Sequence, residues 1–231
     1  MDHNPVRAVV LADALPTAFE LACLVHCADL TRLPGRRRPE WQAPPMPALP
    51  LAAALAEFDQ PDAAARLASL LTDLGFTATC EVRSGGGRRR YDVQRVLAPE
   101  TQRAATNRMM AAAWRQGRLA LLGTDPLGSS SPRNAQRVTL ARAGWRAALL
   151  AGGRQLRTNL LWVRLGDHEM AAVLVRAARL LGVTAELTRR PGCLRVTVSA
   201  AAAPLLLATL AAASPRPGRD NNPVQLAQSA A

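Results

Sequence analysis

The chain has 231 residues, 49% hydrophobic and 20% charged, a balance typical of globular proteins with room for one large domain or two small ones. Its 29 basic and 17 acidic residues give a net charge of +12, which favours a polyanionic partner; every basic residue is arginine, a bias that a GC-rich genome also produces, so the charge alone decides little. Aromatic residues make up only 3%, which argues against a surface that holds single-stranded nucleic acid by stacking its bases.

The first half of the chain predicts helices and strands in alternation. An apolar helix is expected at residues 18–29, AFELACLVHCAD, and the six prolines of residues 33–50 indicate an extended insertion after it. A strand at residues 51–59 precedes a helix from Pro61 that ends before Gly75. A two-stranded hairpin and a helix at residues 101–113 complete this half, so the first domain is expected over residues 1–121.

Residues 122–138, LGTDPLGSSSPRNAQRV, are rich in glycine, serine and proline and predict a linker. The second domain is expected over residues 139–213. It begins with a helix at residues 143–153, AGWRAALLAGG, and continues with a strand at 159–167, a helix from His168, an alternating hairpin and a helix at 200–213. Residues 214–231 are expected to be disordered.

The two halves repeat each other. The segment PDAAARLASLLTDLGFTA from Pro61 matches HEMAAVLVRAARLLGVTA from His168, and both helices have apolar residues three and four positions apart. Asp62 and Asp167 are candidate N-caps or first-turn acids of these helices. The repeated order predicts an α+β protein made of two units, each a sheet covered on one side by helices.

Two α+β units that each open with an apolar helix resemble the LAGLIDADG homing endonucleases, and more specifically the WhiA family of sporulation regulators. The segments that carry the resemblance are GWRAALLAGGRQL, AAVLVRAARLLGVTAELTRR and CLRVTVS in the second half, and FELACLVHCADL and RRRYDVQRV in the first. The resemblance implies pseudo-twofold repeats whose leading helices pack together and whose sheets form a saddle over duplex DNA. It also implies transcription regulation, in sporulation or cell division. The family's C-terminal helix-turn-helix domain has no counterpart in this sequence.

In the cleaving enzymes each central helix ends in a carboxylate that binds a divalent metal ion. The matching positions here are Ala28 and Gly152, and Asp29, one residue further on, is interpreted as a helix cap. We therefore expect a protein that is not an enzyme and has no cofactor. Cys23, His26 and Cys27 form C-x-x-H-C, but because no second ligand cluster is present a pair of buried thiols is favoured over zinc.

Arginines provide the predicted DNA contact. Strand alternation places the polar residues Trp162, Arg164, Thr188, Arg190, Arg195 and Thr197 on the side of the second sheet that faces away from the helices. The predicted DNA-binding residues are Arg83, Arg88, Arg90, Gln94, Trp162, Arg164, Arg190 and Arg195. A solvated face of an arginine-rich protein is the alternative for these residues. The alternative for the whole chain is a protein-interaction module that binds a sigma factor or another regulator without touching DNA.

The cysteines, Cys23, Cys27, Cys80 and Cys193, fit a reducing compartment in which thiols fill the core. The apolar run near the N-terminus is interrupted by Asp13, and no segment reaches the roughly 20 apolar residues that span a bilayer. We expect a soluble, cytoplasmic protein.

Overall fold

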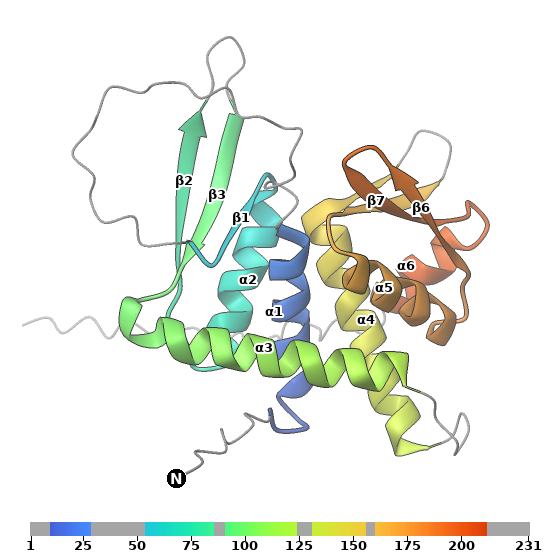
Figure 1. Cartoon of the computed structure of the whole chain (residues 1–231), viewed down its shortest axis with the longest axis horizontal. Coiled ribbons are helices and arrows are strands. Elements are labelled where there is room, and N and C mark those ends of the chain that lie inside the picture. The colour runs from blue at the N-terminus through green and yellow to red at the C-terminus, as the bar shows by residue number, and fades with distance from the viewer. Residues whose placement is uncertain (1–9, 29–53, 86–90, 124–130, 156–159, 212–231) are drawn as a thin grey trace, which may run out of the picture.

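A computed structural model describes residues 10–28, 54–85, 91–123, 131–155 and 160–211 (Figure 1). The first repeat comprises α1 (Leu15–Ala28), β1 (Ala56–Phe58), α2 (Pro61–Asp73), β2 (Thr79–Gly85), β3 (Tyr91–Leu97) and α3 (Glu100–Leu122). The second repeat comprises α4 (Pro132–Gly152), β4 (Gly153–Gln155), β5 (Leu161–Leu165), α5 (His168–Leu180), β6 (Ala185–Arg190), β7 (Cys193–Val198) and α6 (Ala203–Ala211).

Each repeat builds one antiparallel sheet. The first sheet has the strand order β1-β3-β2, and the second has the order β4-β5-β7-β6. With β4 set aside the two orders are the same, because β1 corresponds to β5, β3 to β7 and β2 to β6. The predicted α+β fold with two related repeats is therefore confirmed.

The helices α2 and α5 end in the same way. Each is followed by a glycine with positive φ, Gly75 at 80° and Gly182 at 79°. The next residue then donates its N–H back into the last turn, from Phe76 to the Leu71 carbonyl at 2.9 Å and from Val183 to the Ala178 carbonyl at 3.0 Å. Glycine adopts this left-handed conformation without the steric cost of a Cβ, so the repeated LG pair ends both helices.

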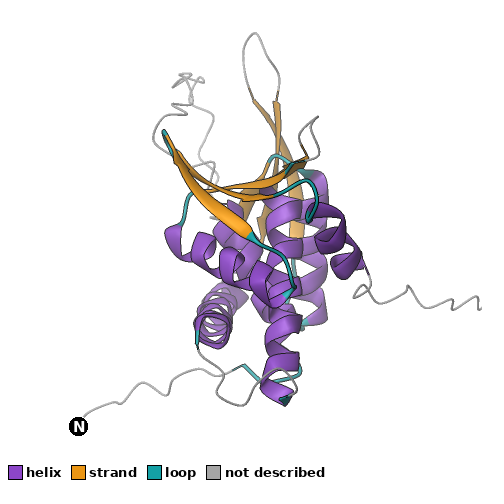
Figure 2. Cartoon of the chain, turned by 90° about the vertical axis from the view of Figure 1, so that its right-hand side faces the viewer, coloured by secondary structure: helices purple, strands orange, loops and turns teal. Residues whose placement is uncertain are grey.

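The helices α1 and α4 lie side by side at the centre of the molecule, and both sheets lie on the same side of the helical layer (Figures 1 and 2). Phe19 of α1 is fully buried and stacks on Trp114 of α3 with ring centroids 5.9 Å apart. Gly144 of α4 lies next to the same ring, and Gly117 of α3 approaches it so closely that a side chain there would overlap it. Small residues thus let three helices meet at Phe19.

The predicted linker at residues 122–138 was wrong at its C-terminal end, because α4 already begins at Pro132. The Ser131 hydroxyl accepts the Asn134 N–H at 3.1 Å, and proline fits the first turn of a helix, so residues that suggested a loop form a helix start. Other predicted helices also have different bounds: α1 begins at Leu15 instead of Ala18, α3 continues to Leu122 instead of ending near Ala113, and α6 begins at Ala203 instead of Ala200. The added turns of α3 bury Trp114, Gly117 and Leu121.

The two short strands β1 and β5 lie inside the predicted segments 51–59 and 159–167. The predicted insertion at residues 33–50 and the predicted tail at 214–231 lie outside the described residues. Among the helices that the structure describes, none has the length and apolar character needed to cross a bilayer.

Candidate nucleic-acid interface

The second sheet separates its apolar and polar residues onto two faces. Leu161, Val163 and Leu165 of β5 are buried towards the helices, whereas the alternate residues Trp162 and Arg164 are half-buried. Strand pairing continues this second set across the sheet, since directly opposed residues of antiparallel strands share a face. We define the outer face of the second sheet by the residues Trp162, Arg164, Glu186, Thr188, Arg190, Arg195 and Thr197.

Two arginines on neighbouring strands lie on this outer face. Arg164 of β5 lies directly opposite Arg195 of β7, and Arg195 in turn lies opposite Thr188 of β6. Within the described part of the chain, neither arginine forms an ion pair with a carboxylate. Arg190, at the end of β6, is exposed on the same face. The outer face of the second sheet is therefore positively charged, with Glu186 as its acidic member.

Trp162 positions one of these arginines. The Arg195 Cζ atom lies 4.5 Å from the centroid of the Trp162 ring, a cation–π contact that holds the guanidinium over the indole. The Nε atoms of Arg164 and Arg195 and the Nε1 atom of Trp162 are all buried without a hydrogen-bond partner. The Nε atoms of Arg103, Arg142 and Arg176 on the helices are buried and unpaired in the same way, so these atoms alone do not mark a ligand site.

The matching face of the first sheet is different. Arg95 of β3 forms ion pairs with Glu57 of β1, Nε to Oε1 at 3.0 Å, and with Glu81 of β2, Nη1 to Oε2 at 3.6 Å. Its side chain is only 7% exposed. Arg83 shares this face through its pairing with Val93. The described residues of the face thus hold two acids and two cations, and Arg95 is not available to a phosphate.

The structure therefore separates the predicted DNA-binding residues. Trp162, Arg164, Arg190 and Arg195 are brought together. Gln94 lies opposite Phe58 and Val82, on the face that packs towards the helices, so grouping it with Arg83 was wrong. The reason is register: Arg83 pairs with Val93, and the next residue along a strand points to the other face. Arg88 and Arg90 lie outside the described residues.

Sequence reasoning missed the ion pairs of Arg95 with Glu57 and Glu81. The three side chains come from three strands, and their alignment depends on a strand order and a register that no local pattern specifies. The signal available in the sequence was the presence of one glutamate in each of the two predicted strands other than the strand that carries Arg95.

The ends of the two central helices carry no ligand groups for a metal ion, because α1 ends at Ala28 and α4 at Gly152. Across the ranges that the structure describes, no three or more His, Cys, Asp or Glu side chains gather in a way that could hold a metal ion. Asp29 lies outside those ranges.

The C-x-x-H-C residues of α1 have separate surroundings. Cys23 and Cys27 are both buried. Burial raises the pKa of Cys27 to about 12, with a smaller contribution from the charge of Asp167, and burial likewise raises the pKa of Cys23 well above its usual value. His26 stacks on Trp114, and its Nδ1 atom lies 3.3 Å from Asp167 Oδ2.

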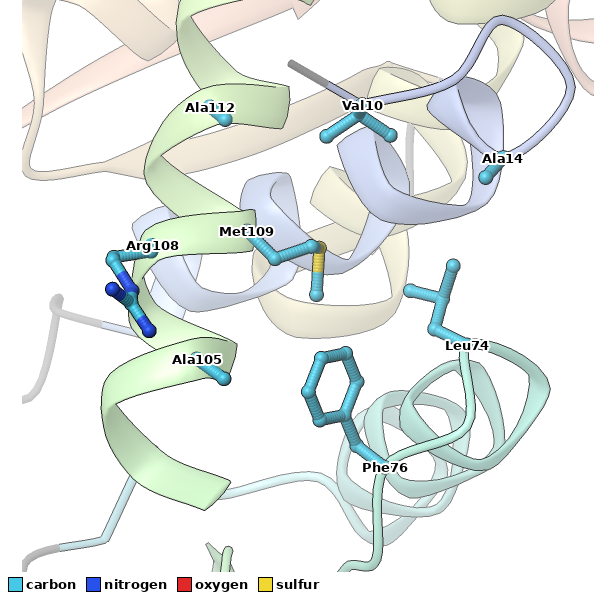
Figure 3. Close-up of a pocket in the computed structure, with 8 residues that line it drawn as sticks. All are labelled: Val10, Ala14, Leu74, Phe76, Ala105, Arg108, Met109 and Ala112. Atoms are coloured by element: carbon cyan, nitrogen blue, oxygen red, sulfur yellow. The ribbon is translucent and has the colours of Figure 1, made fainter. Parts of the chain in front are cut away.

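An apolar pocket of about 420 Å³ lies between the start of α1, the end of α2 and α3 (Figure 3). Leu74 and Phe76 face Met109 across it. It opens near the N-terminal end of α1, whereas the sheets lie beyond the other end of that helix (Figure 1). Apart from the Arg108 guanidinium its walls offer few polar groups, so it does not extend the polar surface of the second sheet. The lining residues are Val10, Ala14, Leu74, Phe76, Ala105, Arg108, Met109 and Ala112.

No protein-family model and no curated protein matches the chain. Among solved structures, full-length DUF199/WhiA from Thermatoga maritima is 12% identical with a TM-score of 0.47, and the match covers 88% of this chain and 62% of that protein. The N-terminal LAGLIDADG domain of DUF199/WhiA is 10% identical with a TM-score of 0.48, covering 92% and 94%. I-DmoI in complex with DNA and Mn is 11% identical with a TM-score of 0.47, covering 87% and 99%. The chain is thus similar to solved structures of WhiA and of I-DmoI, in each case with a TM-score below 0.5.

Proposed function

We propose that this protein binds duplex DNA through the outer face of the second sheet. The observation that carries the proposal is the pair of opposed arginines, Arg164 and Arg195, which have no carboxylate partner among the described residues. Guanidinium groups bind phosphate oxygens strongly, and a sheet surface can lie against the major groove or the backbone of a duplex. Arg190 adds a third positive charge at the edge of the same face.

We further propose that the protein does not cleave the DNA. Metal-assisted phosphodiester hydrolysis uses carboxylates to hold the metal ions, and the central helices α1 and α4 end in Ala28 and Gly152. The resemblance to WhiA supports a regulatory role, in transcription linked to sporulation or cell division. The four cysteines are free, which fits work in a reducing cytoplasm.

A second candidate function is the binding of a protein such as a sigma factor, without direct contact to DNA. The observation that favours it is the exposure of two leucines on α6, Leu205 and Leu207, which are 53% and 40% exposed. Apolar side chains exposed on a protein surface can be covered by a protein partner.

A fluorescence-anisotropy titration with labelled duplex DNA tests the first proposal. We expect micromolar binding at about 50 mM salt that weakens steeply towards about 200 mM, because phosphate contacts release counterions. Arg164→Gln should weaken binding at both salt concentrations. The matched control is Arg179→Gln, which removes an exposed arginine from α5 on the helix side of the second sheet. An absence of micromolar binding at the lower salt concentration would overturn the proposal.

Incubation with supercoiled plasmid and magnesium tests the absence of cleavage. The plasmid should stay supercoiled at protein concentrations that saturate it. Nicked or linear products that an Asp29→Ala variant no longer forms would show that the protein is a nuclease. A protein partner that co-purifies after nuclease treatment, from a chain that binds no duplex, would favour the second candidate function.

A further inference from the structure

The two repeats place one row of three residues at the same point of each sheet. In the first sheet the row is Glu57, Arg95 and Glu81, on β1, β3 and β2. In the second sheet it is Arg164, Arg195 and Thr188, on β5, β7 and β6. Glu57 and Arg164 each come one residue before the last residue of their strand, and Glu81 and Thr188 each follow the helix-ending glycine by the same spacing. The rows are therefore equivalent.

The central residue of both rows is an arginine, but only one of the two arginines is neutralised. Arg95 has a glutamate on each side and forms ion pairs with both. The residues directly opposite Arg195, at the places equivalent to the two glutamates, are Arg164 and Thr188. Directly opposed like charges in a sheet repel, with Cβ atoms about 4.5–5.5 Å apart. The second row therefore has two positive charges and no negative charge, where the first row has one positive and two negative charges.

The charges of this second row point to the missing group. Arg164 and Arg195 lie directly opposite each other and form no ion pair with a described carboxylate, and Trp162 holds the Arg195 guanidinium in place, with its Cζ atom 4.5 Å from the ring centroid. An oxyanion bound to both guanidinium groups would neutralise both charges. A tetrahedral phosphate fits, because its several oxygens can accept paired N–H bonds from two planar guanidinium groups at once.

We propose that Arg164 and Arg195 form a two-guanidinium clamp for a single phosphate group, and that its occupant is a phosphodiester of the DNA backbone. The identity of the occupant rests on the proposed function, whereas the clamp itself recognises phosphate. In the first repeat the carboxylates of Glu57 and Glu81 neutralise Arg95. In the second repeat the bound phosphate supplies the negative charge that neutralises Arg164 and Arg195.

Thermal unfolding of the full chain in sodium phosphate and in sodium chloride at equal ionic strength tests the clamp. The melting temperature of the natural sequence should be higher in phosphate. Arg164→Glu restores the charge found at Glu57, so this variant should melt at a higher temperature than the natural sequence in chloride and should no longer respond to phosphate. Arg164→Gln should also lose the response, whereas Arg179→Gln should keep it.

Equal melting temperatures of the natural sequence in the two salts would overturn the clamp. So would an Arg164→Glu variant that is less stable in chloride, since that result would mean that Arg164 has a structural role. Duplex titrations separate the two proposals. A phosphate response without duplex binding supports the clamp and overturns the proposed function, and duplex binding that Arg164→Gln leaves unchanged overturns the clamp alone.

Discussion

Glu57 and Arg164 occupy equivalent places in the two repeats and carry opposite charges. Each lies directly opposite the arginine at the centre of its sheet, Arg95 or Arg195. In the first repeat the result is an internal ion pair, with Nε and Oε1 3.0 Å apart. In the second it is an unpaired positive surface. The repeated unit thus neutralises its central arginine in the first sheet and places a second arginine beside it in the second.

The slope of DNA-binding affinity against salt concentration should report how many phosphates the protein contacts. Removing one arginine that contacts a phosphate lowers the slope of log K against log salt by about 0.9. We expect this decrease for Arg164→Gln and again for Arg195→Gln, measured by anisotropy over a salt series. The Arg179→Gln control should leave the slope unchanged. A slope that stays the same in both face variants would contradict contact through the second sheet.

Glu20 should be the acidic residue of the described core whose replacement lowers the stability of the protein most. Its carboxylate is 2% exposed and accepts from Arg66 Nε at 2.8 Å and from Arg146 Nη2 at 2.7 Å, so it joins α1, α2 and α4. Removing one partner of a buried charge cluster costs about 3–5 kcal/mol. We expect Glu20→Gln to lower the free energy of unfolding by an amount near the lower end of that range, measured by urea denaturation. The exposed acid Glu186 provides the control, and Glu186→Gln should change stability by less than about 0.5 kcal/mol.

Two glycines that border the Phe19 ring should respond oppositely to alanine. A Cβ on Gly117 would lie 2.1 Å from Phe19 Cδ2, and the ring is fully buried, so it cannot move aside. Gly117→Ala should therefore cost about 1–3 kcal/mol through overpacking. At Gly144 the same Cβ would lie 3.7 Å from the ring, an ordinary contact, and alanine favours the helix by about 1 kcal/mol. Urea denaturation should show Gly144→Ala to be as stable as the natural sequence or more so, and equal losses at both sites would contradict the packing.

The pH dependence of stability should show the stabilising contribution of the Asp167 carboxylate. Its hydrogen bond with His26 lowers its pKa, and the N–H groups of Glu169 and Met170 act in the same direction. A carboxylate with a lowered pKa in the folded state stabilises the protein above its ordinary pKa of about 3.9, and this contribution is lost as the pH falls through the folded value. Asp167→Asn keeps the N-cap but loses the charge, so at pH 7 it should cost at most about 1 kcal/mol.

The difference between Asp167→Asn and the natural sequence should shrink below about pH 4, measured by thermal unfolding over a pH series. Asp167→Ala also loses the cap and should cost about 1 kcal/mol more than Asp167→Asn at neutral pH. A difference between the natural sequence and Asp167→Asn that stays constant from pH 7 to pH 3 would contradict the role of the charge.

Thiol labelling should separate the cysteines into two classes. Cys80 is exposed, whereas Cys23 and Cys27 are buried and have raised pKa values, about 12 for Cys27. Because the thiolate is the reactive form, Cys80 should react rapidly with a thiol reagent at pH 8, and Cys23 and Cys27 should react only after denaturation. Mass spectrometry of the labelled peptides provides the measurement. Rapid labelling of Cys27 in the native protein would contradict its burial in α1.

Local sequence patterns were sufficient to predict the repeat and most of its elements. The apolar spacing of α2 and α5, and the glycines that end both helices, depend on interactions within a few residues. The same holds for β5 and β7, whose alternation correctly predicted that Trp162, Arg164 and Arg195 face away from the helices. Local periodicity is enough here because each side chain's direction follows from its position along a single element.

Strand register and helix packing were decided only by the tertiary structure. Register placed Gln94 on the face opposite Arg83, and it brought Glu57 and Glu81 beside Arg95. Packing against Phe19 extended α3 through Gly117, where the local sequence suggested an earlier end. The sequence alone therefore determined two related α+β units with an arginine-bearing sheet surface. The pairing of distant strands decided which arginines are neutralised and which remain open, because such pairing depends on contacts between residues far apart in the chain.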